Sequence, residues 1–520
     1  GCRKPFKRLW ISSMEDKAIE DGFRNLRDGH DYDALYQAAL CRSEADWLVG
    51  INATRLFTTL YNRKLTVGRV QTPTLAMVVA RNDAIRHFIK EKYFNVHLKC
   101  DGLEVVKEKI FSGEEANLLK NKCNGAEALV TSVQQTKKAV NPPKLYDLTT
   151  LQREANRFFG YTAQKTLDMT QSLYEKKLVT YPRTDSQYLT EDMRDTAVYL
   201  LGAIRRIFLP DSANGDAEIG RIINNSKVSD HHAIIPTATM LTQNWTNLPA
   251  QERALLELIC NRLFCAVSDA CEYDETAVTV ECQGFVFHGK GKTMKRIGWK
   301  LPHDLFMRTL NSAVPSEKED KPYNIQDLQI GQWLYPIISS VHEGTMSPPR
   351  HYTEDSLLAA METAGVEDMR LDAERKGLGT PATRAGILEK LVQAGLMVRQ
   401  GSGKARSLIP TDKGKALIAV MPPEITSAAM TAEWEQRLKA IERGEEDPDA
   451  FLAGIQEMLR EMTCTAKPVP DMAKRFPTKR TRVGICPVCG APVAEFSGKG
   501  FFCENRICKF AIWKDNRFFT

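Results

Sequence analysis

Residues 176–186 read KKLVTYPRTDS, and this segment joins a short extended piece to a dense set of reactive side chains. Pro182 ends the extended piece because proline lacks the N–H that a strand needs. Tyr181 is a candidate nucleophile, since the cation of Arg183 can favour the phenolate and also hold a phosphate. The competing interpretation is a packing role, which is common for a tyrosine beside a proline at a strand end.

A pair of histidines follows in residues 229–237, which read SDHHAIIPT. The imidazole of His231 could move a proton or bind a strained phosphate. A metal site at His231 and His232 is a competing interpretation, but adjacent side chains point apart on a strand and no further ligands lie at metal spacing. A purely structural role for the two imidazoles is the third interpretation.

Candidate phosphate-binding groups lie upstream, in residues 68–74, which read GRVQTPT. Gly68 permits a tight turn, and Arg69 and Gln71 supply a cation and an amide just before a helix whose N-terminus could take a phosphate. Arg42 and Asp46 lie one helical turn apart on an expected helix, where a solvated ion pair is the default interpretation.

Four cysteines near the C-terminus have the spacing of a structural zinc ribbon. They are Cys486, Cys489, Cys503 and Cys508. Four thiolates close a tetrahedral site and leave no position for substrate, so we expect a structural Zn²⁺. Aromatic residues interleave with cations in this segment and could stack single-stranded bases or form the ribbon's core. They are Phe496, Phe501, Phe502, Phe510 and Trp513, beside Lys499, Arg506, Lys509 and Lys514.

The spacing of apolar residues predicts alternating helical and strand-rich regions. Helices are expected at residues 34–64, 73–87, 149–177, 192–207, 251–271 and through most of 353–465, and strands at 93–140 and 273–345. The strand-rich module is therefore interrupted by a helical insert. Within residues 381–420, a helix precedes a basic, glycine-rich hairpin, which resembles a winged helix-turn-helix. Two core helices with a surface hairpin are the alternative.

The composition indicates a soluble protein of several domains. A chain of 520 residues exceeds what one core organises, and no apolar run reaches the roughly 18 residues of a membrane span. The net charge of +6 is too small to indicate nucleic-acid binding by itself. Nine of the 13 cysteines lack disulfide spacing, which favours a reducing cytoplasm. The N-terminus has neither an initiator Met nor a signal-peptide core, so we expect a truncated reading frame.

Several of these segments together resemble one known family. TYPRTDS at 180–186 is similar to the active-site motif of type IA DNA topoisomerases, and HHAIIPT at 231–237 is similar to the motif that follows it. Further segments resemble the family in the same order: GRVQTP at 68–73, HYTE at 351–354 and GTPATRA at 379–385. The paired histidines favour the topoisomerase III branch, and the similarity covers nearly all of the chain.

The resemblance implies a multidomain α+β fold, a toroidal clamp with winged-helix-like helical domains, a β-rich arch and a C-terminal zinc ribbon. The implied divisions are residues 1–15, the end of a TOPRIM domain; 16–92 and 346–465, two parts of a helical DNA-binding domain; 93–148 and 273–345, two parts of the arch; 149–272, an inserted domain with the active-site tyrosine; 466–482, a basic linker; and 483–520, the ribbon.

The resemblance also implies the chemistry. Tyr181 would attack a phosphodiester to give a 5′-phosphotyrosine, Arg183 would stabilise the phosphate, and His231 would assist proton or phosphate handling. The hydroxyl left behind would reverse the bond after strand passage, so ATP is not needed, and the sequence has no Walker A loop. The residues expected to contact DNA are Arg42, Asp46, Gly68, Arg69, Gln71, His232, Thr380, Thr383 and Arg384.

Family members begin with a TOPRIM domain whose glutamate and Asp-x-Asp-x-Glu cluster hold Mg²⁺. This sequence begins after that domain, and its own Asp-x-Asp pairs, at 31–33 and 447–449, lack the glutamate. We therefore expect the Mg²⁺ site to lie outside this chain, which alone would bind single strands but cleave and religate poorly or not at all.

Partners follow from the same resemblance. We expect single-stranded and negatively supercoiled DNA as substrate, a helicase or single-strand-binding protein as partner, no membrane, a monomer, and a location in the bacterial cytoplasm on nucleoid or plasmid DNA. A non-enzymatic single-stranded DNA-binding protein is the alternative, which explains the hairpin and ribbon but not the tyrosine motif. A recombinase or relaxase would require Arg/His sets or histidine clusters at spacings that are absent.

Overall fold

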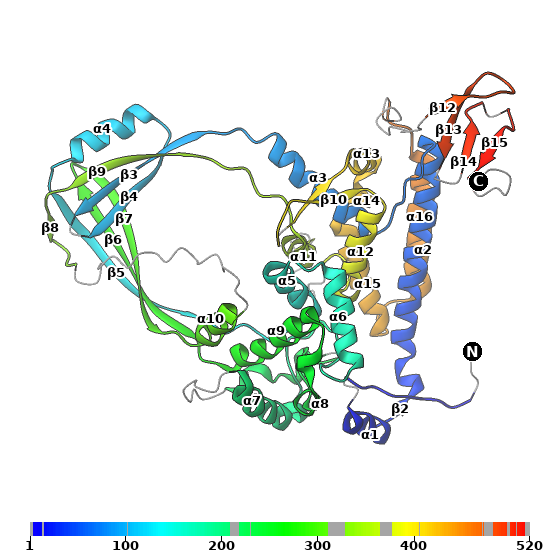
Figure 1. Ribbon diagram of the computed structural model, residues 1–520, viewed down its shortest axis with the longest axis horizontal. Helices are drawn as coiled ribbons and strands as arrows, with labels where there is room; N and C mark the ends of the chain where they lie inside the picture. The colour runs from blue at the N-terminus through cyan, green and yellow to red at the C-terminus, as the bar shows by residue number, and fades with distance from the viewer. Residues whose placement is uncertain are drawn as a thin grey trace.

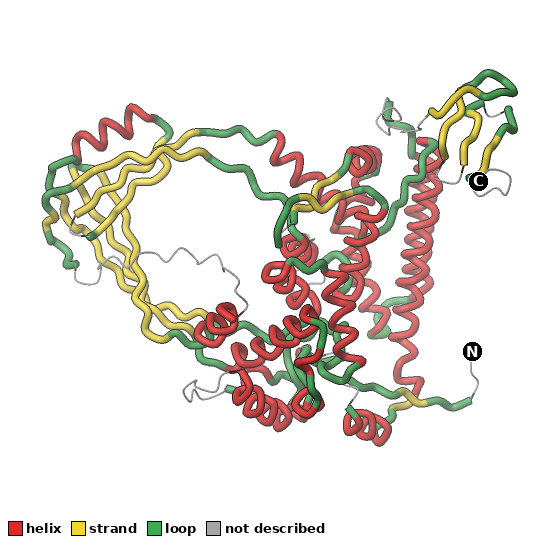
Figure 2. Tube along the Cα trace, viewed as in Figure 1, coloured by secondary structure: helices red, strands yellow, loops and turns green. Residues whose placement is uncertain are grey.

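Helices and strands from alternating parts of the chain gather in two different places. The computed structural model describes residues 4–12, 15–100, 102–208, 218–228, 230–309, 328–364, 377–404, 406–470, 472, 482–496, 500–505 and 507–514. The strands form an arch that leaves the helices and returns to them, so the ribbon traces a ring (Figure 1). Colouring by secondary structure separates the yellow arch from the red helical side (Figure 2).

The arch is one antiparallel sheet of seven strands, in the order β8-β5-β6-β7-β4-β3-β9. The strands are β3 (Lys92–Cys100), β4 (Leu103–Ile110), β5 (Ala128–Val140), β6 (Cys271–Cys282), β7 (Phe285–Arg296), β8 (Trp333–Leu334) and β9 (Ile338–Thr345). Alternate residues of β6 are buried, because a strand turns successive side chains to opposite faces. Val130, Val280 and Phe287 belong to a hydrophobic core that is separate from that of the helices.

Two helices lie inside regions predicted as strands, so those predictions were wrong at these places. Helix α4 (Gly113–Cys123) packs on β3 and β9, and α10 (Lys300–Thr309) packs on α9 (Ala250–Val267). The Oγ of Ser112 accepts the Glu115 backbone N–H at 3.3 Å, which caps the first turn of α4. Ser112 is thus the local sequence signal for α4, and the alternating pattern of the neighbouring strands hid it.

The inserted helical segment carries the tyrosine motif. Its helices are α5 (Leu148–Phe159), α6 (Ala163–Glu175), α7 (Arg194–Phe208), α8 (Ala238–Thr242) and α9. The single helix predicted at 149–177 is two helices, because Gly160 adopts a left-handed φ of 71° and Thr162 caps α6. A Cβ at position 160 would lie 2.8 Å from the backbone of Lys404, so the close approach also requires glycine.

Several more helices belong to this side of the molecule, and two of them pack on the longest. These are α2 (Asp33–Tyr61), α3 (Gln71–Arg86), α11 (Glu354–Thr363), α12 (Pro381–Gln393), α13 (Asp412–Val420), α14 (Pro423–Thr426), α15 (Ala428–Glu442) and α16 (Pro448–Thr465). Helix α2 packs on α15 and α16 through Ala45, Val49 and Ala53. The predicted hairpin is present as β10 (Met397–Gln400) and β11 (Ser407–Pro410), and it follows α12 as in a winged helix.

A four-stranded sheet ends the chain, with strands β12 (Arg482–Ile485), β13 (Pro492–Phe496), β14 (Gly500–Cys503) and β15 (Ala511–Trp513). Most of the predicted linker at 466–482, and the cations Lys499 and Arg506, fall outside the described residues. Within the described ranges, no helix combines the length and apolar character that crossing a bilayer requires.

Candidate active site

The two motifs that the sequence singled out run side by side. The backbone N–H of Thr180 donates to the Ile235 carbonyl at 3.0 Å, and the Thr180 hydroxyl donates to the Ala233 carbonyl at 3.0 Å. Val179 forms an isolated antiparallel bridge with Pro236. The extended segment is therefore anchored on the histidine segment up to Thr180, directly before Tyr181.

This pairing brings Tyr181 against His231. Their ring centroids are 4.3 Å apart, and the ring of Tyr174, on α6, meets Tyr181 edge-on at 5.5 Å. Tyr181 is half-buried, so one side of the phenol remains open to a substrate. Burial lowers the pKa of His231 below its ordinary 6.5, against the opposing effect of Asp230 and Asp185. The imidazole is therefore neutral at pH 7 and can accept a proton.

Arg183 is exposed two residues after Tyr181, and its Nη1 donates to the Gln171 side chain at 3.2 Å. A neutral amide leaves the guanidinium charge uncompensated by that contact, so the cation is available to a phosphate. The hydroxyls of the motif are used internally: Thr184 donates to the His231 carbonyl at 2.7 Å, and Ser186 donates to the Lys227 carbonyl at 2.9 Å.

His232 points away from the site into the protein. It is 6% exposed, and its Nδ1 lies 2.9 Å from the Ala233 carbonyl oxygen. Burial lowers its pKa. The two imidazoles thus have different environments, as adjacent positions of an extended segment require, and the side chain of His232 supports the segment from within.

The upstream residues form an ion-pair network rather than an i,i+4 pair. Arg42 binds Glu435 at 2.6 Å, and Arg69 binds both Glu435, at 3.0 Å, and Asp46, at 2.6 Å. The default interpretation of an Arg42–Asp46 pair is therefore wrong, because each partner finds a closer one across the fold. The side chain of Arg69 is 4% exposed. The two arginines outweigh the effect of burial and lower the pKa of Glu435, a residue that the sequence analysis missed.

Hydrogen bonds within the turn before α3 hold its side chains in place. The backbone N–H of Gly68 donates to the Thr72 hydroxyl at 3.1 Å, and Gln71 Nε2 donates to the Thr66 carbonyl at 3.3 Å. Gln71 is half-buried at the surface, whereas Arg69 is inside. Of this turn, Gln71 is the side chain best exposed to meet a strand.

The downstream motif shapes the start of α12. Thr380 and Thr383 form a capping box around its first turn. Arg384 is 4% exposed, and its guanidinium donates to the Leu378 carbonyl at 3.1 Å and to the Thr149 hydroxyl at 3.0 Å. Arg384 therefore joins α12 to α5, the helix that follows the arch.

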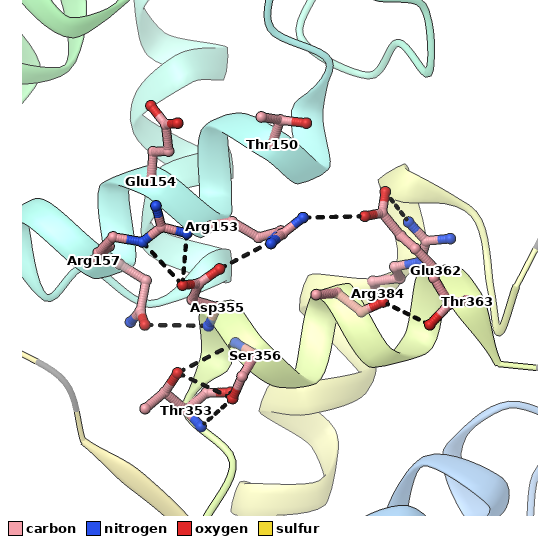
Figure 3. A network of polar contacts seen from close by, with 12 residues as sticks. Thr150, Arg153, Glu154, Arg157, Thr353, Asp355, Ser356, Glu362, Thr363 and Arg384 are labelled. Atoms are coloured by element: carbon pink, nitrogen blue, oxygen red, sulfur yellow. Dashed lines mark hydrogen bonds and ion pairs between the residues drawn. The ribbon is translucent and has the colours of Figure 1, made fainter. Parts of the chain in front are cut away.

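A cluster of charged residues joins α5 to α11 (Figure 3). Arg153 Nε lies 2.9 Å from one oxygen of Asp355, and Arg157 Nη2 lies 3.0 Å from the other. Glu362 continues the cluster with Arg384, at 3.3 Å. These contacts connect the segment that carries Tyr181 to the segment that carries α12.

The four predicted cysteines converge at the C-terminal sheet. Their sulfur atoms all lie within 4.8 Å of one another, with 3.7 Å between Cys486 and Cys508 and 3.4 Å between Cys489 and Cys503. A tetrahedral Zn²⁺ with bonds of about 2.3 Å needs sulfurs roughly 3.8 Å apart, so the set fits zinc. Around it, Phe502 meets Trp513 edge-on, and Lys514 lies over Phe501.

Mg²⁺ binds oxygen ligands, often one or two carboxylates. Across the described part of the chain, the one group of three or more His, Cys, Asp or Glu side chains close enough to share an ion is the cysteine cluster, whose ligand atoms are sulfur. That cluster does not fit Mg²⁺.

Comparisons with known proteins agree on one family. The sequence family described as DNA topoisomerase matches residues 30–453. DNA topoisomerase 3 of Bacillus subtilis is 37% identical over 98% of this chain and 71% of its own length. DNA topoisomerase 3 of Shouchella clausii is 38% identical over 98% of this chain and 70% of its length. Full-length topoisomerase I of Thermotoga maritima has a similar fold, with a TM-score of 0.67, 22% identity, and coverage of 98% of this chain and 80% of that one.

Proposed function

Because the chain belongs to the type IA DNA topoisomerase family, in its topoisomerase III branch, we propose that Tyr181 is the residue that cuts one DNA strand. The observation that carries this proposal is the contact between Tyr181 and His231, 4.3 Å between ring centroids, which joins the two motifs at one place. A non-enzymatic DNA-binding role is not favoured, since the family's members are named as topoisomerases.

The proposed reaction is a transesterification. The phenol oxygen of Tyr181 forms a bond to phosphorus while the bond to the 3′-oxygen breaks, leaving a 5′-phosphotyrosine and a 3′-hydroxyl. The phenol proton passes to the neutral imidazole of His231, and the exposed guanidinium of Arg183 stabilises the charge on the phosphate. Religation runs the same steps in reverse, and the phosphotyrosine conserves the bond energy, so no nucleotide is consumed.

Strand passage needs the ring to open, and we assign the movement to separate domains. The arch, residues 93–148 and 273–345, has its own hydrophobic core, which supports its moving as a unit against the helices. We place Tyr181 on the inserted domain, residues 149–272, whose charged contacts with α11 would have to break during opening.

The other residues that we expected to contact DNA fall into an exposed group and a buried group. Gln71, Thr380 and Thr383 lie at the start of helices, where backbone N–H groups favour phosphate. Gly68 permits the tight turn, while Arg42 and Asp46 hold Arg69 through the Glu435 network. We infer that Arg69, His232 and Arg384 act from inside, by fixing the elements that carry the exposed groups.

We further propose single-stranded regions of negatively supercoiled DNA as the substrate, with Mg²⁺ held by groups outside the described residues. A helicase or single-strand-binding protein would supply such regions to a monomer in the bacterial cytoplasm. The cysteine cluster would hold Zn²⁺ in a structural role.

The test is a covalent-adduct assay with 3′-end-labelled single-stranded DNA, with and without Mg²⁺. We expect a labelled protein–DNA adduct with the parent chain, or with the parent chain supplemented by a relative's TOPRIM domain, and none with Tyr181→Phe. Tyr199→Phe, at an exposed position of α7, is the matched control and should form adduct normally. Equal adduct from the Tyr181→Phe variant, or none from any mixture that binds DNA, would overturn the proposal.

A further inference from the structure

A short segment before α1 (Asp16–Arg24) crosses the active site and holds both of its key residues. The backbone N–H of Tyr181 donates to the Ser12 carbonyl at 2.9 Å, and the Ser12 hydroxyl lies 3.0 Å from Nδ1 of His231. Trp10 Nε1 donates to the Asp230 carbonyl at 2.7 Å, next to His231. Three hydrogen bonds thus tie one segment to two motifs that are distant in sequence.

The same segment covers the outer face of the imidazole. Trp10 stacks on His231 with 5.8 Å between ring centroids and an interplanar angle of 16°. Trp10 also stacks on Tyr32 at 5.6 Å and 9°, and the guanidinium of Arg8 lies over Tyr32. The imidazole of His231 therefore contacts both the indole of Trp10 and the phenol of Tyr181. These ring contacts restrict rotation of the imidazole and contribute to its burial.

We propose that Trp10 and Ser12 are positioning residues that orient the imidazole of His231 toward the phenol of Tyr181. In this arrangement Nδ1–H of His231 donates to the Ser12 hydroxyl, which leaves Nε2 free to accept the phenol proton. The inference rests on the proposed role of His231 as proton acceptor. It adds two residues that no sequence motif contains.

The charges around His231 define the expected pH behaviour. Burial, to which Trp10 contributes, opposes its protonation and outweighs Asp230 and Asp185, which favour it. Removing the indole would expose the imidazole to water. The pKa of His231 should then rise toward 6.5, and the acidic limb of the cleavage profile should move to higher pH.

The first test measures the pKa of His231 itself, by hydrogen–deuterium exchange at the histidine C2 position followed by mass spectrometry, and it needs no activity. We expect the pKa to rise in Trp10→Ala, to rise less in Trp10→Phe, which retains a stacking ring, and to stay unchanged in Trp333→Ala, an exposed tryptophan of the arch. An unchanged pKa in a folded Trp10→Ala chain would contradict the proposal, whatever the adduct assay shows.

The second test separates positioning from binding. In the adduct-forming mixture, Ser12→Ala should slow cleavage at saturating DNA about tenfold, because small misplacements of a proton acceptor are costly. The Kd for single-stranded DNA should change less than about twofold, and Ser12→Thr, which keeps the hydroxyl, should recover most of the rate. A parallel loss of DNA affinity in Ser12→Ala and Trp10→Ala would instead assign this segment to base stacking and overturn the inference.

Discussion

The imidazole of His231 and the phenol of Tyr181 meet with 4.3 Å between ring centroids, although they belong to different segments. Because burial lowers the pKa of His231, the neutral ring dominates above 6.5 and is lost as the pH falls through the lowered value. Cleavage should therefore be constant between about pH 7 and 8 and should decline under acidic conditions. His231→Ala should reduce cleavage about 100-fold and flatten this acidic limb. If cleavage by the His231→Ala variant still declined at acidic pH, a group other than His231 would be responsible for the decline.

Arg183 is expected to act on the phosphate rather than on folding. Arg183→Ala should lower the cleavage rate about 100-fold, because a cation beside a developing charge is lost, and Arg183→Lys should recover part of it. Thermal stability should not change, since the side chain is exposed. Gln171→Ala, which removes the hydrogen-bond partner of Arg183, serves as control and should have a small effect. Single-turnover adduct formation measures all three rates.

The contribution of Asp147 to the free energy of unfolding should fall as the pH rises. It caps α5 by accepting the Thr150 N–H at 2.6 Å, and burial raises its pKa from 3.8 to about 6. Between these values the folded chain binds a proton that the unfolded chain has lost. This contribution to stability is therefore full below pH 3.8 and is lost as the pH rises through 6. The buried charge then costs about 3 kcal/mol at pH 8.

Asp147→Asn tests this directly, because asparagine keeps the cap and removes the charge. The variant should be more stable than the parent at pH 8, by at most about 3 kcal/mol, and should lose that advantage near pH 4. Asp147→Ala is the control that removes cap and charge together. Urea unfolding at several pH values gives the difference, and a pH-independent difference would contradict the assignment.

The charged contacts between α5 and α11 should stabilise the closed ring. Asp355→Asn removes the carboxylate that Arg153 and Arg157 share and leaves Arg153 only Glu362, at 3.7 Å, so we expect a loss of about 1–2 kcal/mol that shrinks at high salt. Asp412→Asn breaks an exposed pair with Lys415 and should cost less than about 0.5 kcal/mol. Denaturant unfolding at low and high salt compares them. Equal small losses would show that the cluster does not hold the two segments together.

Zinc removal should affect the C-terminal sheet alone. Elemental analysis should find about one Zn²⁺ per chain, and Cys486→Ser should abolish it, while Cys464→Ser, at an exposed cysteine outside the cluster, should not. Limited proteolysis of the chelated protein should cut within residues 482–514 and spare the helices. Zinc retained by Cys486→Ser would place the metal elsewhere.

The sequence predicted the helices, strands and motifs well, but it did not predict which distant residues contact one another. The helix expected at residues 34–64 is Asp33–Tyr61, and the alternation at 276–280 lies within β6, because periodicity reports burial directly. The same periodicity missed α4, whose capping serine is a weaker signal. Trp10, Ser12 and Glu435 could not be found this way, since each acts through residues far along the chain and leaves no local repeat.

The separate hydrophobic core of the arch also bears on how damage would harm a cell. A substitution such as Phe287→Ala would leave a cavity in that core and lower the free energy of unfolding by about 3–5 kcal/mol, without touching the pairing of residues 178–180 with 233–237. Such a chain would still break DNA but would guide no second strand through the opening. An arch lesion would therefore harm a cell differently from a lost nucleophile, because DNA would be cut and resealed without being untangled.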